Sequence, residues 1–257
     1  MIETAAITEY LDELLGTSRI PDYPGAVNGL QLSNSEPVRK IAAAVDFSSR
    51  SVAAAIAENA NLLLVHHGMF WSGTRPITGA SFKRIRSLIE NGVAVYSSHL
   101  PLDCHPTFGN NVLLSRTLNL EPDGEFAHFK GTAIGVRGRA NTPTFELVER
   151  ARAFARKHGG EVVVSGLQPG AMTKSWAICT GSGASTDTLE EAVTLGVDTL
   201  IVGEGPHWTA VEADELGIAL IYAGHYATET LGVRALAQHL AEKFSIEWFP
   251  VHAPTGL

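Results

Sequence analysis

The sequence has only two cysteines among its 257 residues, and it has neither a long apolar run nor an excess of basic residues. Cys104 and Cys179 form no CxxC pair and no disulfide framework, so we expect a reducing, cytoplasmic location. No apolar stretch is long enough to span a bilayer. Residues 1–16 have the apolar spacing of an amphipathic helix, which differs from the continuous apolar core of a secretory signal. We therefore expect no membrane association.

Basic residues are outnumbered, with 19 Lys and Arg against 27 Asp and Glu and a net charge of -8. This balance argues against a broad basic surface for nucleic acid, although it leaves room for a local patch. Low-complexity segments, coiled-coil heptads and charge blocks are also missing from the sequence. The hydrophobic content of 45% and the length allow a large core, in one large domain or two small ones.

The most informative segment is the apolar run 62–65, which is followed directly by His66 and His67. A strand alternates its side chains, so the two imidazoles would point apart unless the chain turns there, and Gly68 permits such a turn. Adjacent histidines at a strand end indicate a metal site, but histidines also cap strands or donate to backbone carbonyls. The pair by itself is weak evidence.

Two further histidines stand four positions before a carboxylate. His99 precedes Asp103 and His225 precedes Glu229, and each pair follows another apolar, strand-like run. On one helical turn this spacing faces both groups the same way. With the adjacent histidine pair, these groups supply more ligands than one tetrahedral ion needs, which indicates two neighbouring ions. Imidazole and carboxylate ligands without thiolate favour zinc, iron or manganese over calcium.

The segments 41–103 and 175–229 show the same predicted order of strand, helix, strand, helix and strand. Strands that alternate with helices indicate parallel βαβ units. We interpret the two segments as an internal repeat, although two unrelated βαβ units would look alike. In this alignment the pair at 66–67 corresponds to residues 203–207, and His99 corresponds to His225. Similar polar groups thus follow equivalent strands, at the carboxyl ends where open α/β sheets bind ligands.

Residues 124–170 connect the two repeats. Their pattern predicts a strand at 132–136, a helix at 144–158 and a strand at 161–165, which we interpret as edge structure and a connection. The second repeat also contains Gly181-Ser182-Gly183 between a strand and a helix. Backbone amides at such a helix start can hold a phosphate. However, the sequence lacks the Lys-Ser/Thr ending of a P-loop and the third glycine of a dinucleotide fingerprint.

These motifs, in this order, resemble the Nif-three-like family, whose members are also named GTP cyclohydrolase I type 2 homologues. The resemblance covers nearly the whole chain in its short form, without the extra inserted domain of longer relatives. Where members typically have proline after the two histidines, this chain has Gly68, which changes backbone stiffness and removes no ligand. The shared markers are Asn28-Gly29-Leu30-Gln31, the histidine pair with Phe70-Trp71, residues 96–103, Gly109-Asn110-Asn111, Gly181-Ser182-Gly183, residues 198–207 and residues 224–229.

The resemblance implies an α/β fold of two similar, intertwined halves with mixed and parallel sheets and a metal site in the cleft between them. We expect the first half at about 1–125 and the second at about 126–257, intertwined near the C-terminus. His99 is either a further ligand or a group that orients Asp103. Family members resemble toroidal homohexamers, so we expect a homohexamer here. The implied ligands of the two ions are His66, His67, Asp103, His225 and Glu229.

The family name implies ring-opening hydrolysis of GTP. We expect a metal-dependent hydrolase acting on a nucleotide or related small molecule, with Glu204 or His207 carrying a proton. The alternative is a non-catalytic, metal-binding or regulatory hexameric scaffold, for which the ligand set would be saturated. A third interpretation, a ring that threads nucleic acid, requires a basic lumen, which the acidic total disfavours.

Overall fold

A computed structural model describes residues 2–257, and the chain folds into two units. Unit 1 contains the residues up to His105 and the later segment Gly232–Ala253. Unit 2 contains Pro106–Leu231 and the last residues, Pro254–Leu257. The chain thus leaves unit 1 after His105 and returns to it at Gly232. Within residues 2–257, no helix combines the length and apolar character needed to cross a membrane.

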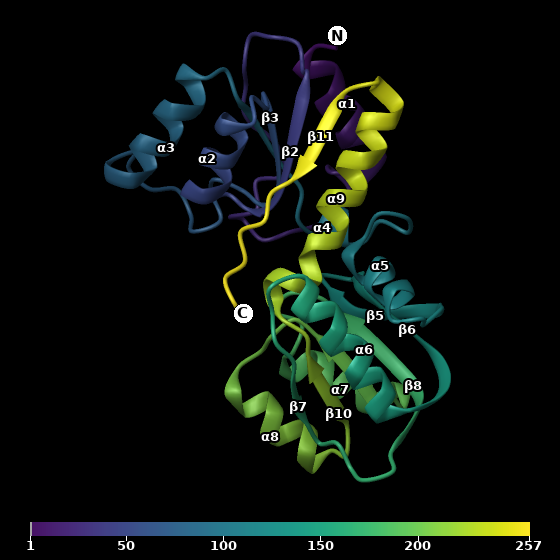
Figure 1. The fold of residues 1–257 in the computed structure, drawn as a ribbon. Helices are drawn as coiled ribbons and strands as arrows, with labels where there is room; N and C mark the ends of the chain where they lie inside the picture. Colours follow the sequence, from purple (N-terminus) through teal and green to yellow (C-terminus); the bar gives the residue numbers. More distant parts are fainter. Residues whose placement is uncertain (1) are drawn as a thin grey trace. The chain divides into compact units, whose positions relative to one another are not determined.

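Unit 1 is built on a five-stranded sheet in the order β1-β4-β3-β2-β11. Strands β3, β2 and β11 are labelled in Figure 1. Strands β11, β2, β3 and β4 run parallel, and β1 pairs antiparallel with β4. The predicted strand-helix alternation of the first repeat is therefore confirmed. The elements are α1 (Thr4–Leu15), β1 (Gly29–Leu32), β2 (Lys40–Asp46), α2 (Ser49–Ala57), β3 (Leu62–His67), α3 (Gly79–Glu90), β4 (Ala94–Ser97), α4 (Leu100–Asp103) and β11 (Glu247–Pro250).

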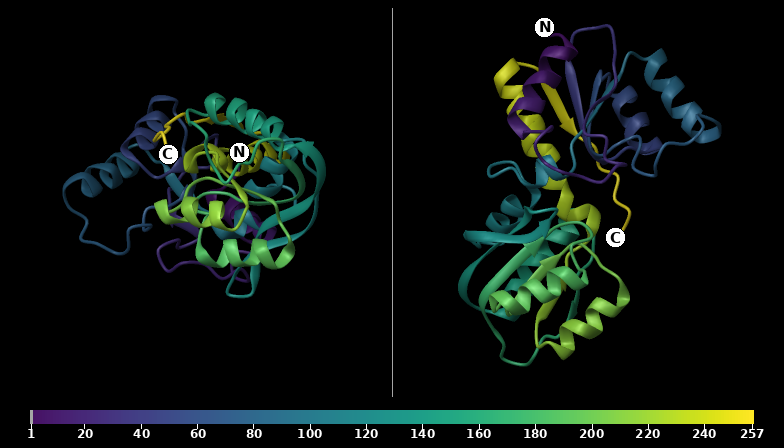
Figure 2. Two further views of the ribbon diagram at one scale, coloured as in Figure 1. Left: turned by 90° about the horizontal axis from the view of Figure 1, so that it is seen from below. Right: turned by 180° about the vertical axis from the view of Figure 1, so that it is seen from behind.

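Helices cover both faces of the unit 1 sheet, as the all-buried pattern of β3 requires. On one face, Leu63 and Val65 pack with Val52 of α2 and Leu88 of α3. The other face carries α1 and the later part of α9 (His225–Phe244), which lie side by side (Figure 2). Tyr10 of α1 contacts Phe244 there with ring centroids 5.5 Å apart.

Unit 2 is built on a six-stranded sheet in the order β5-β6-β8-β9-β10-β7. Strands β8, β9 and β10 run parallel, which confirms the alternation predicted for the second repeat, and β5, β6 and β7 pair antiparallel with their neighbours. The elements are α5 (Asn110–Thr117), β5 (Pro122–Phe129), β6 (Thr132–Pro143), α6 (Thr144–Lys157), β7 (Val163–Ser165), β8 (Met172–Cys179), α7 (Thr186–Leu195), β9 (Thr199–Val202), α8 (His207–Glu215), β10 (Ala219–Tyr222) and the start of α9.

Alternate residues of the unit 2 strands supply two separate cores. Trp176 and Ile178 of β8 pack with Leu147 and Phe154 of α6. Ala177 and Cys179, the intervening residues, pack on the opposite face with α7 and α8. The connection predicted at 124–170 thus contains two edge strands, β5 and β7, while β6 lies inside the sheet between β5 and β8.

Equivalent hydrogen bonds support the internal repeat. Asn61, just before β3, accepts through its side chain from the backbone N–H groups of residues 39 and 40, at the start of β2. Asp198, just before β9, accepts in the same way from residues 174 and 175 in β8. The first parallel pair is aligned identically in the two sheets, because Ile41 pairs with Leu62 as Trp176 pairs with Thr199.

At the third strand of each repeat, the structural alignment of the two repeats differs by one residue from the alignment predicted from the sequence. Ala94 and Ala219 begin the third strands at matching register positions, so His99 matches Gly224 and not His225. Pattern matching aligned the two histidines because each precedes a carboxylate by four residues. The backbone bonds Asp103 N–H to His99 O and Thr228 N–H to Gly224 O show the true correspondence.

Candidate metal centre

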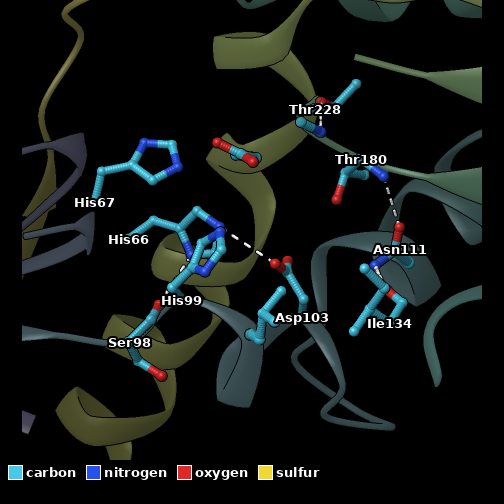
Figure 3. A network of polar contacts seen from close by, with 12 residues as sticks. His66, His67, Ser98, His99, Asp103, Asn111, Ile134, Thr180 and Thr228 are labelled. Atoms are coloured by element: carbon cyan, nitrogen blue, oxygen red, sulfur yellow. Dashed lines mark hydrogen bonds and ion pairs between the residues drawn. The ribbon is translucent and has the colours of Figure 1, made fainter. Parts of the chain in front are cut away.

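Three histidine side chains of unit 1 converge at the carboxyl ends of neighbouring parallel strands (Figure 3). His66 and His67 end β3, and His99 follows β4 and precedes α4. One nitrogen from each ring lies within 4.8 Å of the others, and all three residues are buried. The centroids of the His66 and His67 rings are 4.9 Å apart, so consecutive residues of this strand end do not point apart.

The Nδ1 atom of each ring is held by an oxygen. A carbonyl or carboxylate oxygen accepts hydrogen bonds, so Nδ1–H is the donor, and this tautomer leaves each Nε2 with a lone pair. Imidazoles that ligate metals are typically oriented in this way by carbonyls and carboxylates. The residues therefore fit a metal ion. The pairs are His66 with the Ser98 carbonyl at 2.9 Å, His67 with Asp46 Oδ1 at 2.9 Å, and His99 with Asp22 Oδ1 at 2.8 Å.

Asp22 fixes more than the His99 ring. Its Oδ2 also accepts from the Asn28 side-chain amide at 2.8 Å and from the Leu100 N–H at 2.9 Å. Asn28 in turn accepts from the His99 N–H through Oδ1 at 2.8 Å. Burial raises the pKa of Asp22, but the hydrogen bond and charge of His99 and the bond from Asn28 outweigh it, so the pKa is lowered overall. The ionised carboxylate therefore holds the His99 ring directly and the His99 backbone N–H through Asn28.

Asp103 adds a carboxylate to this set from the short helix α4. Its Oδ2 lies 3.4 Å from Nε2 of His66, and both side chains are buried (Figure 3). The Asp103 N–H donates to the His99 carbonyl at 3.1 Å, which is the backbone turn expected from the four-residue spacing. The sequence left His99 as a ligand or as an orienting group for Asp103. Its ring nitrogen gathers with those of the other two imidazoles, which favours the role of ligand.

Gly68 is needed for space and not for an unusual backbone angle. Its φ lies outside the left-handed region, but a Cβ there would sit 2.3 Å from Nε2 of Gln31. Gln31 donates to the carbonyls of Ala26 and Val27 and accepts from the Met69 N–H at 2.6 Å. This side chain thereby fastens the loop that follows the histidines, which explains the glutamine of the N-terminal motif.

Unit 2 presents a different group at the start of α9. His225 Nδ1 lies 2.7 Å from Glu204 Oε1, and His225 Nε2 lies 3.0 Å from Glu229 Oε2. His225 and Glu229 are one helical turn apart on α9, as the sequence predicts, and Glu204 follows β9. Glu229 is buried, whereas Glu204 is partly exposed. The three residues form a compact group of one imidazole and two carboxylates.

The two carboxylates hold a proton on His225. Burial, the largest influence, lowers the pKa of His225, but hydrogen bonds and charge interactions with Glu229 and Glu204 outweigh it and raise the pKa to about 9. At neutral pH without a metal the ring is therefore protonated, and its single positive charge offsets part of the charge of the two carboxylates. Ligation of a metal through this ring has to displace that proton, because only the neutral imidazole ligates.

Close backbone packing brings the Gly181-Ser182-Gly183 loop against Glu229. Gly181 has φ +63°, and a Cβ there would lie 2.2 Å from Glu229 Oε1. Its N–H donates to Thr228 Oγ1 at 3.2 Å. The start of α7 is capped by Ser185, whose hydroxyl accepts from the Thr188 N–H, and the Ala184 N–H donates to the Glu204 carbonyl. With these amides engaged, the loop serves the packing of Glu229, which argues against the phosphate loop considered from the sequence.

His207, which the sequence proposed as a proton carrier, is the exposed first residue of α8. Within residues 2–257 it forms no hydrogen bond with Glu204 or His225. Glu204 does contact His225, and Ser182 Oγ lies 3.3 Å from Glu204 Oε1. Sequence reasoning missed Asp22 and Asp46. Asp46 offered a signal, because a carboxylate that ends β2 must lie beside the end of the parallel β3.

The chain matches the family model described as Duf34/NIF3 (NGG1p interacting factor 3) over residues 2–254. The chain belongs to the DUF34/NIF3 family. A relative from Pyrococcus horikoshii is 41% identical over 98% of both chains, and one from Pyrococcus abyssi is 40% identical over 100% of both. Both relatives are named GTP cyclohydrolase 1 type 2 homolog.

Solved structures of the same family share the fold. Protein ybgI is 32% identical with a TM-score of 0.89 over 100% of both chains. TTHA1606 from Thermus thermophilus is 33% identical with a TM-score of 0.86 over 100% of both. The family resemblance predicted from the strand-end histidines and the other markers is therefore confirmed. The predicted mixed α/β fold class is confirmed as well. The NIF3 fold here carries histidine and carboxylate groups that can bind a metal ion.

Proposed function

We propose that this protein is a metal-dependent hydrolase that holds two divalent ions per chain and acts on a nucleotide or related small molecule. One observation carries the proposal. His66, His67 and His99 gather their ring nitrogens within 4.8 Å, and each ring is fixed by an oxygen on its Nδ1. Burying three imidazoles this closely is unfavourable unless they share a cation or other partners.

The proposed ligands are His66, His67, His99 and Asp103 from unit 1 and His225 and Glu229 from unit 2. Zinc, iron and manganese all suit imidazole and carboxylate ligands. A divalent ion held by such groups would supply Lewis acidity. It would also lower the pKa of water, so that hydroxide is available as a nucleophile near neutral pH. The names of the relatives support a purine nucleotide such as GTP as the first substrate to test.

The protein groups around the ligands have separable tasks. Asp22, Asp46 and the Ser98 carbonyl orient the unit 1 imidazoles, so that no reorganisation is needed when the ligands act. Glu204 contacts Nδ1 of His225 and is partly exposed, which suits the exchange of a proton with solvent. We retain Glu204 as the first candidate proton carrier and His207 as the second.

We propose in addition that the protein is a cytoplasmic homohexamer, as the resemblance implies. The competing function is a metal-binding or regulatory scaffold without turnover. The two functions differ in coordination, since catalysis requires a ligand position open to water or substrate and storage does not.

Elemental analysis of purified protein, followed by a nucleotide turnover screen, tests the proposal. We expect about two transition-metal ions per chain in the wild type, and loss of metal together with activity in His66→Ala and Glu229→Ala. Glu204→Gln should keep its metal and lose turnover. Loss of metal in Glu204→Gln would contradict its role as proton carrier. Full metal content without turnover of any nucleotide would favour the scaffold, and the absence of metal after reconstitution would refute both functions.

A further inference from the structure

A groove of about 610 Å³ opens in unit 1 beside the imidazoles. His67 and Asp46 line one end of it, and the first turns of α3 line the other. Its size falls in the range of about 300–1,000 Å³ that holds small-molecule ligands. A small molecule bound in the groove would therefore lie next to His67, one of the proposed metal ligands. The other residues that line the groove indicate the chemical class of that molecule.

Two arginines, Arg75 and Arg84, lie along the groove. Within residues 2–257 neither forms an ion pair with an acidic side chain, and Arg84 Nε is buried without a hydrogen-bond partner. Arg86, two residues further along the same helix, has its charge balanced by Glu90 at 2.7 Å. Guanidinium groups bind phosphate and carboxylate in a fork geometry, so the two unpaired arginines favour an anionic ligand.

The Arg84 guanidinium is positioned over the groove wall. Its Cζ lies 5.6 Å from the ring centroid of Phe47, which also lines the groove. The acidic residue in the groove, Asp46, already accepts from His67 Nδ1, so the arginines leave an excess of positive charge. The start of α3 adds to this potential, because its N-cap residue Thr78 makes no side-chain cap and the helix dipole is positive there.

An aromatic surface connects the arginines to the imidazoles. The Trp71 ring lies 4.7 Å from the His67 ring and 4.5 Å from the His99 ring, and 39% of Trp71 is exposed. Trp71 and Phe70 both line the groove. A flat ring stacked on such a surface is stabilised by contact with the aromatic face. The groove thus combines a stacking surface near the metal ligands with a cationic region further away.

We infer that this groove binds the substrate, and that the substrate is a phosphorylated molecule with a flat aromatic ring, which is the chemistry of a nucleotide. Arg75 and Arg84 bind the phosphate, and Trp71 stacks against the ring. The inference rests on the proposed function for its link to hydrolysis, but the binding itself is measurable without turnover.

Isothermal titration of metal-loaded protein with GTP, guanosine and tripolyphosphate tests this site. We expect GTP affinity to fall at least about tenfold in Arg84→Gln and in Arg75→Gln, because each loses a charge-assisted hydrogen bond. Guanosine affinity should stay within about twofold in both variants, and Trp71→Ala should weaken guanosine and spare tripolyphosphate. Arg86→Gln is the matched control, since it removes the same charge from the same helix outside the groove, and it should bind GTP like the wild type.

Equal GTP affinity in the wild type, Arg75→Gln and Arg84→Gln would overturn the site, as would the absence of GTP and tripolyphosphate binding to the wild type at millimolar concentration. Metal content and thermal melting of each variant show that the protein is folded and loaded. GTP binding that depends on the arginines, without turnover, would support the groove as the binding site and contradict the proposed hydrolase activity. Turnover with an unchanged KM in both arginine variants would support the hydrolase activity and contradict the groove as the substrate-binding site.

Discussion

The donor groups of the two units differ in how they are prepared for a metal. In unit 1, three imidazoles are each oriented by an oxygen on Nδ1, and their residues are at most 7% exposed. In unit 2, a single imidazole lies between two carboxylates, and its side chain is 24% exposed. Unit 1 therefore offers mainly pre-oriented ring nitrogens, whereas unit 2 offers mainly carboxylates.

This difference shows two ways of keeping ligands together without a cation. The unit 1 rings are buried and are held by their Nδ1 bonds, so their orientation is retained. The unit 2 carboxylates would repel each other, and a proton on His225, whose pKa is raised to about 9, reduces that repulsion. Metal binding in unit 2 should therefore depend on displacing a proton, and metal binding in unit 1 on the rigidity of the supporting residues.

The largest expected effect comes from removing the charge that supports His99. Asp22 accepts four hydrogen bonds, shared between both of its carboxylate oxygens. In Asp22→Asn one oxygen becomes an NH2 group that faces donors, so we expect a loss of about 1–3 kcal/mol in unfolding free energy. Metal affinity should fall about 10- to 100-fold, as for other outer partners of ligating histidines. Urea unfolding and competition with a chelator measure the two effects.

Asp46→Asn provides the matched control in the same unit. Asp46 holds His67 through one oxygen, and its side chain is 36% exposed. The amide oxygen of asparagine can still accept from Nδ1, so we expect a smaller change in both quantities. Equal effects of the two substitutions would show that the number of bonds to Asp22 is unimportant.

A smaller effect should follow from adding one methyl group in unit 2. In Gly181→Ala the new Cβ would collide with Glu229 Oε1, and the residue would keep a φ of +63°. We expect a roughly tenfold loss of metal affinity from the displaced carboxylate, besides about 1–2 kcal/mol of backbone strain. Gly196→Ala has almost the same φ, +65°, with no atom within 4 Å of the added Cβ. Gly196→Ala should show the backbone strain with unchanged metal affinity. A loss of metal affinity in this variant too would show that the effect of Gly181→Ala does not come from the collision with Glu229.

The gathering of the three unit 1 histidines could be predicted from the sequence because each lies at the end of a strand or just after one. Periodicity locates strand ends, and parallel strands bring those ends to one edge, so His66, His67 and His99 were predicted without any structure. The i,i+4 spacing likewise predicted that His225 and Glu229 share a turn of α9.

The supporting groups could not be predicted in the same way. Asp22 lies in an irregular segment after α1, and it reaches His99 across 77 sequence positions, a pairing that no local pattern encodes. Strands β1, β5 and β11 were missed because they lie at sheet edges, where few residues are buried and the apolar alternation is weak. The turn predicted at Gly68 is present, since the Trp71 N–H donates to the Gly68 carbonyl, but the close approach of Gln31 to this glycine could not be predicted.

The smallest expected effect concerns a feature that the two units share. The first helix of each repeat begins with a reciprocal capping box, Ser48 with Ser51 in α2 and Ser185 with Thr188 in α7. Ser48→Ala and Ser185→Ala should each cost about 1 kcal/mol of unfolding free energy, because one backbone N–H loses its acceptor. Thr78→Ala is the control, since Thr78 precedes α3 without capping it and its loss should cost much less. Denaturant titration of the three variants compares the units directly. Similar losses of unfolding free energy would show that the two capping boxes stabilise their units equally. A loss in only one unit would show that the start of the other helix is held by packing alone.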